Sequence, residues 1–156
     1  MRILVLSDLH GRGSRFEQAV EAQPQAKAVL FLGDGVEQAK ELAAFYPQKS
    51  FYFVCGNCDL ASLEPSTRTV TLNGTKILMT HGHKYGVKYS LEPLLQAAEQ
   101  QGCKIAVYGH THLAHEAYRN GIYLLNPGCL CGSRAKPSYG IIDLTPQGIL
   151  TGIAYL

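Results

Sequence analysis

Five short polar clusters in the sequence carry side chains that can bind metal ions. Each follows an apolar run of strand length, such as residues 2–7 before the first cluster and 105–108 before the last. The clusters are Asp8-Leu9-His10, Gly33-Asp34, Gly56-Asn57-Cys58-Asp59, His81-Gly82-His83 and Gly109-His110-Thr111-His112. Ligands of α/β proteins sit outside the carboxyl ends of the strands, so we expect the clusters to converge in space. Gly109 is expected to permit the bend that lets His110 and His112 both reach inward.

The donor types predict a centre for two divalent ions. Carboxylates, imidazoles and an amide suit manganese, iron, cobalt, nickel or zinc better than magnesium or calcium. Seven candidates are too many for one tetrahedral ion, but they fit two ions about 3.5–4 Å apart, as in two-metal hydrolases. Asp34 is the natural bridge, because a carboxylate can span two ions and a neutral imidazole cannot. The candidate ligands are Asp8, His10, Asp34, Asn57, His81, His110 and His112.

The charge of such a centre indicates its substrate. Two divalent ions carry four positive charges, of which Asp8, Asp34 and a bridging hydroxide would neutralise three. The remaining positive charge favours an anionic substrate. Because metal ions lower the pKa of bound water and polarise phosphoryl oxygens, the expected chemistry is hydrolysis of a phosphate ester.

The predicted strands and helices that position these clusters follow different patterns in the two halves of the chain. In the first half, apolar strands at 2–7, 28–32 and 51–54 alternate with helices at 14–22 and 36–45, and Ser14 is the expected N-cap of the first helix. This pattern predicts a buried parallel sheet with right-handed crossovers. In the second half, the turn signals Asn73-Gly74 and Asn120-Gly121 predict two hairpins.

Hairpin strands are expected at 67–72, 76–80, 114–118 and 122–125, and further strands at 105–108, 138–144 and 149–155. A helix is expected at 89–101, with Gly102 after its end. The predicted fold is an α/β four-layer α-β-β-α sandwich, in which helices flank two facing sheets. The length suggests that residues 1–156 form one domain.

Composition and charge exclude several classes of protein. The chain is 46% hydrophobic and 17% charged, which is typical of a globular protein. Its formal charge is only +2 and its basic residues are scattered, so we expect no dedicated nucleic-acid binding. The first apolar run, residues 3–6, is too short for a signal peptide or a membrane span. We therefore expect a cytoplasmic protein that does not bind membranes and has reduced cysteines.

The five cysteines do not form a recognised zinc or redox motif. Cys55 and Cys58 form a C-x-x-C pair, but the second pair, Cys129 and Cys131, is C-x-C and lies about seventy residues away. A thioredoxin-like motif would open a helix, and residues 60–65 allow only a short one. We interpret most of these cysteines as small buried residues.

The order D-x-H, GD, GN-x-D, H and GHTH, spanning residues 8 to 112, resembles the calcineurin-like metallophosphoesterase superfamily. The compact length and the segment 56–59 are most similar to its small prokaryotic phosphodiesterase subfamily. Asn126-Pro127-Gly128 also resembles that subfamily, in which serine commonly follows instead of Cys129. The resemblance implies a helix-flanked β-sandwich and hydrolysis by a metal-activated water, without a covalent intermediate. It assigns Asp8, His10 and His112 to the first ion, Asn57, His81 and His110 to the second, and Asp34 to the bridge.

Cys58 departs from this pattern, because many members of the superfamily have histidine there. That histidine stabilises the transition state or protonates the leaving group, whereas a thiol, with a pKa of about 8.5, is a weak donor. We therefore expect slow turnover of esters with alkoxide leaving groups and faster turnover of activated aryl esters. The candidate catalytic residues are Cys58, Asp59, which would orient a neighbour, and His83, which is either a substrate-side group or a solvent-exposed histidine.

Two other side chains are weighed against solvent-exposed or structural roles. Arg12 lies near the first cluster in sequence and is a minor candidate for contacting phosphate, while His115 is interpreted as structural. The leading function is a metal-dependent phosphodiesterase that acts on a small-molecule phosphate ester. Manganese is the favoured ion, with nickel, iron, zinc or cobalt as alternatives. Two alternative functions stay open: a phosphomonoesterase, and a weakly active protein-interaction scaffold of the same fold, as in a eukaryotic retromer subunit. A homo-oligomer also stays open.

Overall fold

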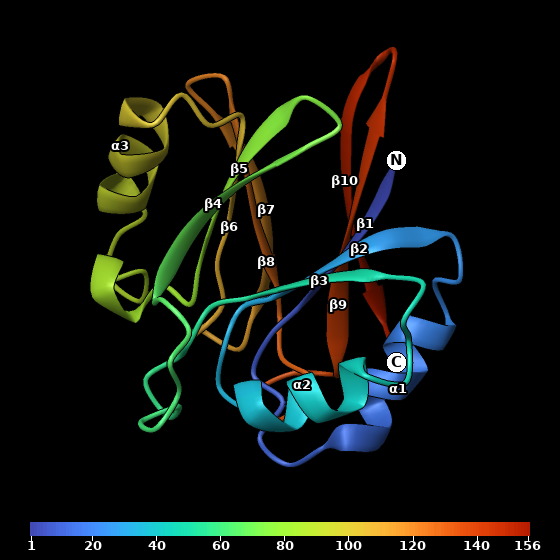
Figure 1. Ribbon diagram of the computed structural model, residues 1–156. Coiled ribbons are helices and arrows are strands. Elements are labelled where there is room, and N and C mark those ends of the chain that lie inside the picture. The colour runs from blue at the N-terminus through green and yellow to red at the C-terminus, as the bar shows by residue number, and fades with distance from the viewer.

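The computed structural model describes residues 1–156, which form four layers (Figure 1). Two five-stranded sheets face each other. Two helices, α1 and α2, cover the outer face of one sheet, and a third helix, α3, covers the outer face of the other. The α/β four-layer α-β-β-α sandwich predicted from the sequence is therefore confirmed.

The first sheet has the strand order β10-β9-β1-β2-β3. Its parallel strands are β1 (Arg2–Leu6), β2 (Ala26–Phe31) and β3 (Ser50–Phe53), joined by α1 (Gly13–Glu21) and α2 (Val36–Ala43). The closing strands β9 (Ser138–Thr145) and β10 (Gly148–Tyr155) are antiparallel. Ser14 was predicted as the N-cap of the first helix, and this is wrong. The helix already begins at Gly13, so Ser14 lies within its first turn and caps nothing.

The second sheet has the strand order β4-β5-β6-β8-β7. Its strands are β4 (Thr67–Leu72), β5 (Thr75–Thr80), β6 (Ile105–Val107), β7 (Ala114–Arg119) and β8 (Ile122–Pro127). Both predicted hairpin turns are confirmed: Asn73-Gly74 and Asn120-Gly121 have positive φ at both residues, as a tight hairpin turn requires. β5, β6 and β8 run parallel, so their carboxyl ends lie at one edge of the sheet.

The helix α3 (Glu92–Gln100) begins three residues later than the sequence pattern indicated. A short 3₁₀ helix, η1 (His83–Tyr85), and a turn over residues 86–89 precede it, so residues 89–91 are not helical. Pro93, in the first turn of α3, fits this later start, because proline needs no backbone hydrogen bond there. Residues 60–65, where a short helix was allowed, contain none. None of the helices combines the length and the apolar character needed to cross a bilayer.

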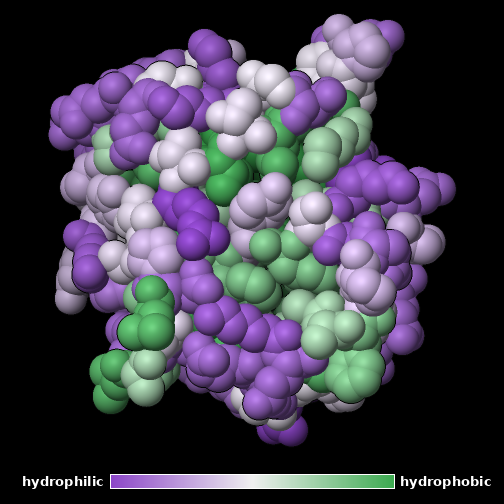
Figure 2. All heavy atoms as spheres, in the orientation of Figure 1, coloured by the Kyte–Doolittle hydropathy of each residue, from purple (hydrophilic) through white to green (hydrophobic).

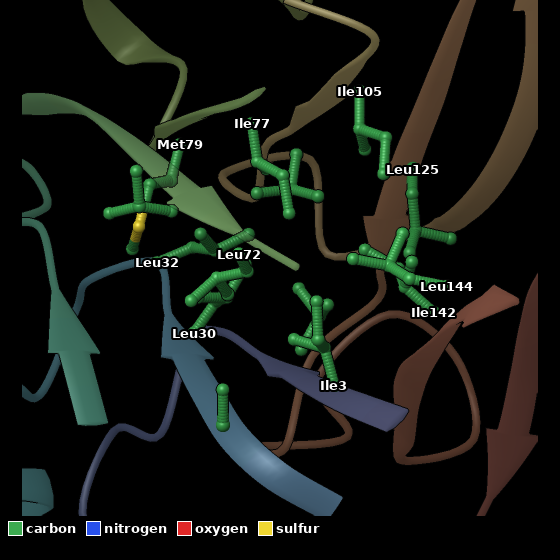
Figure 3. Close-up of a cluster of buried hydrophobic side chains, with 14 of the residues drawn as sticks. Ile3, Leu30, Leu32, Leu72, Ile77, Met79, Ile105, Leu125, Ile142 and Leu144 are labelled. Atoms are coloured by element: carbon green, nitrogen blue, oxygen red, sulfur yellow. The ribbon is translucent and has the colours of Figure 1, made fainter. Parts of the chain in front are cut away.

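A shared core joins the two sheets. Along β1, Ile3 and Val5 point toward the second sheet, whereas Leu4 and Leu6 point toward the helices, because successive strand residues face opposite sides. Figure 3 shows the interior between the sheets, where Ile3 and Leu30 of the first sheet lie near residues such as Ile77 of the second. This packing fixes the carboxyl ends of β1, β2 and β3 relative to those of β5 and β6.

Replacing Ile77 with alanine should destabilise the protein by about 2–5 kcal/mol, because the fully buried side chain would leave a cavity between the sheets. Urea unfolding followed by circular dichroism measures this loss. The control is Leu150→Ala on β10, whose side chain is 63% exposed and which should change the free energy of unfolding by less than about 0.5 kcal/mol. Equal losses in the two variants would contradict the assignment of this core.

Candidate metal centre

The carboxyl ends of five strands bring the seven candidate ligands together. Asp8 and His10 follow β1, Asp34 follows β2, Asn57 follows β3, His81 follows β5, and His110 and His112 follow β6. The Nε2 atoms of His10 and His81 lie 3.6 Å and 3.5 Å from Asp34 Oδ2. His112 Nε2 lies 2.9 Å from Asp8 Oδ1. Side chains more than a hundred positions apart in sequence thus converge at one edge of the sandwich.

The tautomer of His81 directs the lone pair of its Nε2 atom into this cluster. Its Nδ1 lies 2.8 Å from the carbonyl oxygen of Leu32, which can only accept, so Nδ1 carries the proton. In this tautomer Nε2 of the fully buried ring is an acceptor, and it lies 3.1 Å from Asn57 Oδ1 and 3.5 Å from Asp34 Oδ2. Three acceptors that face one another need a positive charge between them. This arrangement fits a metal ion.

Asp8 contributes a buried carboxylate that is already ionised. Burial raises the pKa of Asp8, but the neighbouring His112 and His81 rings and a hydrogen bond from Ser7 outweigh it, so the pKa falls below its ordinary value. Oδ2 accepts hydrogen bonds from Ser7 Oγ and from the backbone N–H of His110. Oδ1 is buried and accepts no well-directed hydrogen bond, although His112 Nε2 is close to it. The geometry therefore leaves one carboxylate oxygen free for an ion.

His110 is held in its neutral, ligating form. Burial, together with the neighbouring His81 and Lys88, lowers the pKa of His110 to about 4. At neutral pH its ring keeps a free lone pair, which metal binding requires. Its Nδ1 lies 3.2 Å from His81 Nε2, so the two rings face the same point.

Three groups of side chains each have donor atoms that lie within 4.8 Å of one another inside the group. They are Asp8–Asp34–His81, His10–Asp34–Cys58 and His10–His112–Cys131. Asp34 belongs to two of these groups, which is the placement that a bridging carboxylate needs. Both cysteines, in contrast, lie at the side of the centre where His10 is exposed.

Most of the candidate ligands have a strained backbone. Five of the seven have positive φ: Asp8 (56°), His10 (43°), Asp34 (59°), His110 (67°) and His112 (62°). Such conformations are uncommon outside glycine and cost free energy unless the surroundings impose them. No sequence pattern indicated this strain, which aims side chains from short loops into one volume.

Gly109 has a different role from the one expected. It does not have positive φ, so the prediction that it supplies the bend is wrong, and His110 and His112 themselves take the left-handed conformation. A Cβ at Gly109 would lie 2.0 Å from Ser7 Oγ and 2.9 Å from Asp8 Oδ2. Glycine is needed here because the loop after β6 packs directly against the end of β1.

Asn126 is a positioning residue that the sequence indicated only as part of the family resemblance. Its buried amide Nδ2 donates to the carbonyl of Gly109 and to Thr111 Oγ1, both at 3.0 Å. These bonds hold the loop that presents His110 and His112. The signal for this role was a polar side chain at the end of the apolar strand β8.

Asp59 acts on the backbone around Asp34. Its carboxylate accepts hydrogen bonds from the backbone N–H groups of Asp34 (2.7 Å), Gly35 (2.8 Å), Val36 (3.0 Å) and Gly56 (2.8 Å). Burial raises the pKa of Asp59, but these four bonds outweigh it and hold the pKa below its ordinary value. The carboxylate thus orients the Asp34 loop and the first turn of α2.

The remaining catalytic candidates flank the cluster. Cys58 is exposed, and its backbone N–H donates to Asp34 Oδ1 at 2.8 Å. Burial of the thiol and the nearby Asp34 carboxylate raise the pKa of Cys58, so the thiol stays protonated at neutral pH. The His83 ring centroid lies 5.5 Å from that of His81, and its buried Nδ1 has no hydrogen-bond partner. Burial and the neighbouring His81 lower the pKa of His83.

Two weaker candidates lie outside the cluster, and one expectation about the cysteines is corrected. Arg12 is exposed at the start of α1, and His115 Nδ1 lies 2.8 Å from the Tyr108 hydroxyl. Cys129 and Cys131 form a disulfide, so the expectation that all cysteines are reduced is wrong. Their Cα atoms are 5.3 Å apart, which is within the range that a disulfide can span.

Residues 1–147 match the sequence model of the calcineurin-like phosphoesterase superfamily domain. The chain belongs to this superfamily. It is 32% identical to a probable metallophosphoesterase of Bacillus subtilis over 92% of this chain and 85% of that protein. It is 28% identical to phosphodiesterase YfcE of Escherichia coli, over 99% and 98% of the two chains.

A crystal structure of Vps29 from Entamoeba histolytica in complex with zinc has the same fold, with a TM-score of 0.77 and 19% identity over 99% of each chain. Membership of the metallophosphoesterases implies divalent metal ions, and the donors of this structure fit them. The resemblance recognised in the sequence is therefore confirmed at the level of the superfamily and the fold.

Replacing Asp59 with asparagine should weaken the protein at neutral pH and flatten its acid sensitivity. A depressed pKa in the folded state stabilises the protein above the unfolded value, about 3.9, and this contribution is lost as the pH falls through the folded value. Urea unfolding at a series of pH values from neutral to acid measures both effects. Glu116→Gln, at an exposed carboxylate on β7, is the control. An unchanged pH profile for Asp59→Asn would refute this role.

Proposed function

We propose that residues 1–156 form one domain that acts as a metal-dependent phosphodiesterase. The observation that carries the proposal is the set of facing acceptors at His81, Asn57 and Asp34, which calls for a cation. In this proposal two divalent ions are held, with manganese favoured. Asp8, His10 and His112 hold the first ion, Asn57, His81 and His110 hold the second, and Asp34 bridges them.

The proposed chemistry divides between the ions and the chain. When bound, the ions supply an activated water and polarise the phosphoryl oxygens. Asp59 keeps the bridging carboxylate in place, and Asn126 does the same for the loop of His110 and His112. Cys58 lies beside Asp34 with its thiol protonated, so it can offer only a weak hydrogen bond to a leaving group. This favours esters whose leaving groups need little protonation.

An apolar surface beside Cys58 supports a phosphate ester with an organic group as the substrate. A cavity of about 230 Å³ adjoins Cys58 and Asp59, and it is also lined by Leu60 and Ala61. Leu60 and Leu63 are 94% and 99% exposed in the loop between β3 and β4. Figure 2 shows hydrophobic side chains projecting at the lower left, where Figure 1 places this loop. The organic group of a phosphate ester, whether a diester or a monoester, would find apolar contact there.

The same exposed leucines favour the scaffold as a second candidate, because an apolar loop can also bind a protein. Comparing the rates on an aryl phosphodiester and an aryl phosphomonoester separates the two enzymatic functions. If the protein neither took up metal nor hydrolysed either ester, the scaffold would be the function that the result supports.

The metal-free protein should be inactive toward bis(p-nitrophenyl) phosphate, and manganese should restore activity. His81→Ala should lower kcat/KM by roughly 100-fold or more, since removing even an outer-shell partner costs roughly 10–100-fold. Bound manganese, counted by elemental analysis, should fall in parallel. His115→Ala is the control, because His115 contacts Tyr108 outside the cluster. Full activity after chelation would refute the proposal.

Cys58→His should raise turnover more for a diester with a poor leaving group than for the p-nitrophenyl diester. The imidazolium can donate the proton that an alkoxide needs, whereas the activated phenolate leaves without one. The measurement is the ratio of kcat between the two substrates in the wild type and the variant. Cys58→Ser, which adds no proton donor near neutral pH, should leave the ratio unchanged. An equal gain on both substrates would contradict this explanation.

A further inference from the structure

Ser133, in the loop between β8 and β9, contacts the His112 ring at the nitrogen that faces away from Asp8. Its Oγ lies 2.7 Å from His112 Nδ1, whereas Nε2 of the same ring lies 2.9 Å from Asp8 Oδ1. Both nitrogens of the ring therefore have a polar neighbour. The residues that supply these neighbours come from different parts of the chain, so the contact on each side depends on the folded structure.

The contact at Nδ1 bears on how His112 can bind an ion through Nε2. A neutral imidazole that gives the lone pair of Nε2 to an ion carries its proton on Nδ1, and that proton needs an acceptor. The Ser133 hydroxyl oxygen is within hydrogen-bond distance of Nδ1, whereas Cys131 Sγ is farther away, at 3.7 Å. The hydroxyl is therefore the better acceptor for this ring.

The disulfide of Cys131 leaves the Ser133 oxygen free to accept this hydrogen bond. Cys131 Sγ lies 3.2 Å from Ser133 Oγ, and a disulfide sulfur has no proton, so it can only accept. The Ser133 hydroxyl can direct its proton toward this sulfur, in a weak hydrogen bond, and a lone pair toward His112 Nδ1. Both contacts of the hydroxyl are then compatible with a ring that donates from Nδ1.

The segment that carries Ser133 is also fastened to the end of β1. The backbone N–H of Cys131 donates to the carbonyl of Asp8 at 3.0 Å, and the N–H before it donates to the carbonyl of Ser7 at 3.1 Å. One short segment, residues 130–133, therefore contacts Asp8 through its backbone and His112 through a side chain. These are two of the ligands that the proposed centre assigns to its first ion.

We propose that Ser133 is a positioning residue, which accepts a hydrogen bond from His112 Nδ1 and so directs Nε2 toward the first ion. The inference rests on the proposed metal centre. Without this acceptor the ring loses one of its two contacts, and removal of such a partner lowers metal affinity roughly 10–100-fold. Because Ser133 is exposed, water can replace the hydroxyl, so we expect the lower end of this range, roughly tenfold.

Calorimetric titration with manganese measures this contribution. Ser133→Ala should weaken one of the two binding steps roughly tenfold and leave the other unchanged. Ser133→Thr keeps the hydroxyl and should bind manganese as the wild type does. The control is Ser50→Ala, at an exposed serine that begins β3, at the opposite end of that strand from Asn57. Because both serines are exposed, the melting temperature of either alanine variant should change by less than about 2 °C.

Nuclear magnetic resonance of the zinc-loaded protein tests the hydrogen bond itself, independently of activity. With isotope-labelled histidine, the His112 Nδ1 proton should give a signal that is protected from exchange with water in the wild type and in Ser133→Thr. In Ser133→Ala the same proton should exchange rapidly, and its signal should be lost. A residue that only stabilised the loop would not produce this contrast at a single ring nitrogen.

The possible results separate this inference from the proposed function. Wild-type manganese affinity in Ser133→Ala, or an Nδ1 proton that is as protected as in the wild type, would overturn the role of Ser133 and leave the metal centre intact. Equal weakening of both binding steps together with a lower melting temperature would make Ser133 a structural residue and would also overturn the inference. Absence of any metal uptake by the wild type would overturn both the inference and the proposed function.

Discussion

Acceptor atoms of His81, Asn57 and Asp34 face one another at the edge of this sandwich. The arrangement is unfavourable by itself, because the acceptors of His81 and Asp34 are buried away from water. It persists because the Leu32 carbonyl fixes the His81 tautomer and because the core between the sheets holds the strand ends in place. A cation between these atoms would stabilise the same arrangement, which then serves as a binding site.

The surrounding structure is organised to maintain this geometry. The carboxylate of Asp59 takes four backbone hydrogen bonds around Asp34, and the amide of Asn126 secures the loop after β6. Left-handed backbone conformations at five candidate ligands are tolerated because these bonds and the close packing at Gly109 impose them. Residues that would not touch a substrate therefore hold the candidate ligands in position.

Two sulfur atoms, the Cys58 thiol and the Cys131 sulfur of the disulfide, lie at the edge of the donor set. Cys58 stands beside Asp34, and Cys131 beside His112, so sulfur flanks the exposed His10 on two sides. Nitrogen and oxygen donors alone are compatible with manganese, whereas added sulfur shifts the preference toward zinc or cobalt.

The sequence alone determined the fold and the candidate ligands. Apolar runs set the strands, Asn-Gly pairs set both hairpin turns, and a polar residue after each parallel strand marked the edge where ligands gather. These signals are local, so a single chain can display them. The tertiary structure decided which nitrogen of His81 carries the proton and why residue 109 must be glycine. It also decided the hydrogen bonds of Asp59 to backbone amides and the pairing of Cys129 with Cys131. Each of these depends on the approach of atoms from separate strands or on the path of a loop, which residue types and spacing do not encode.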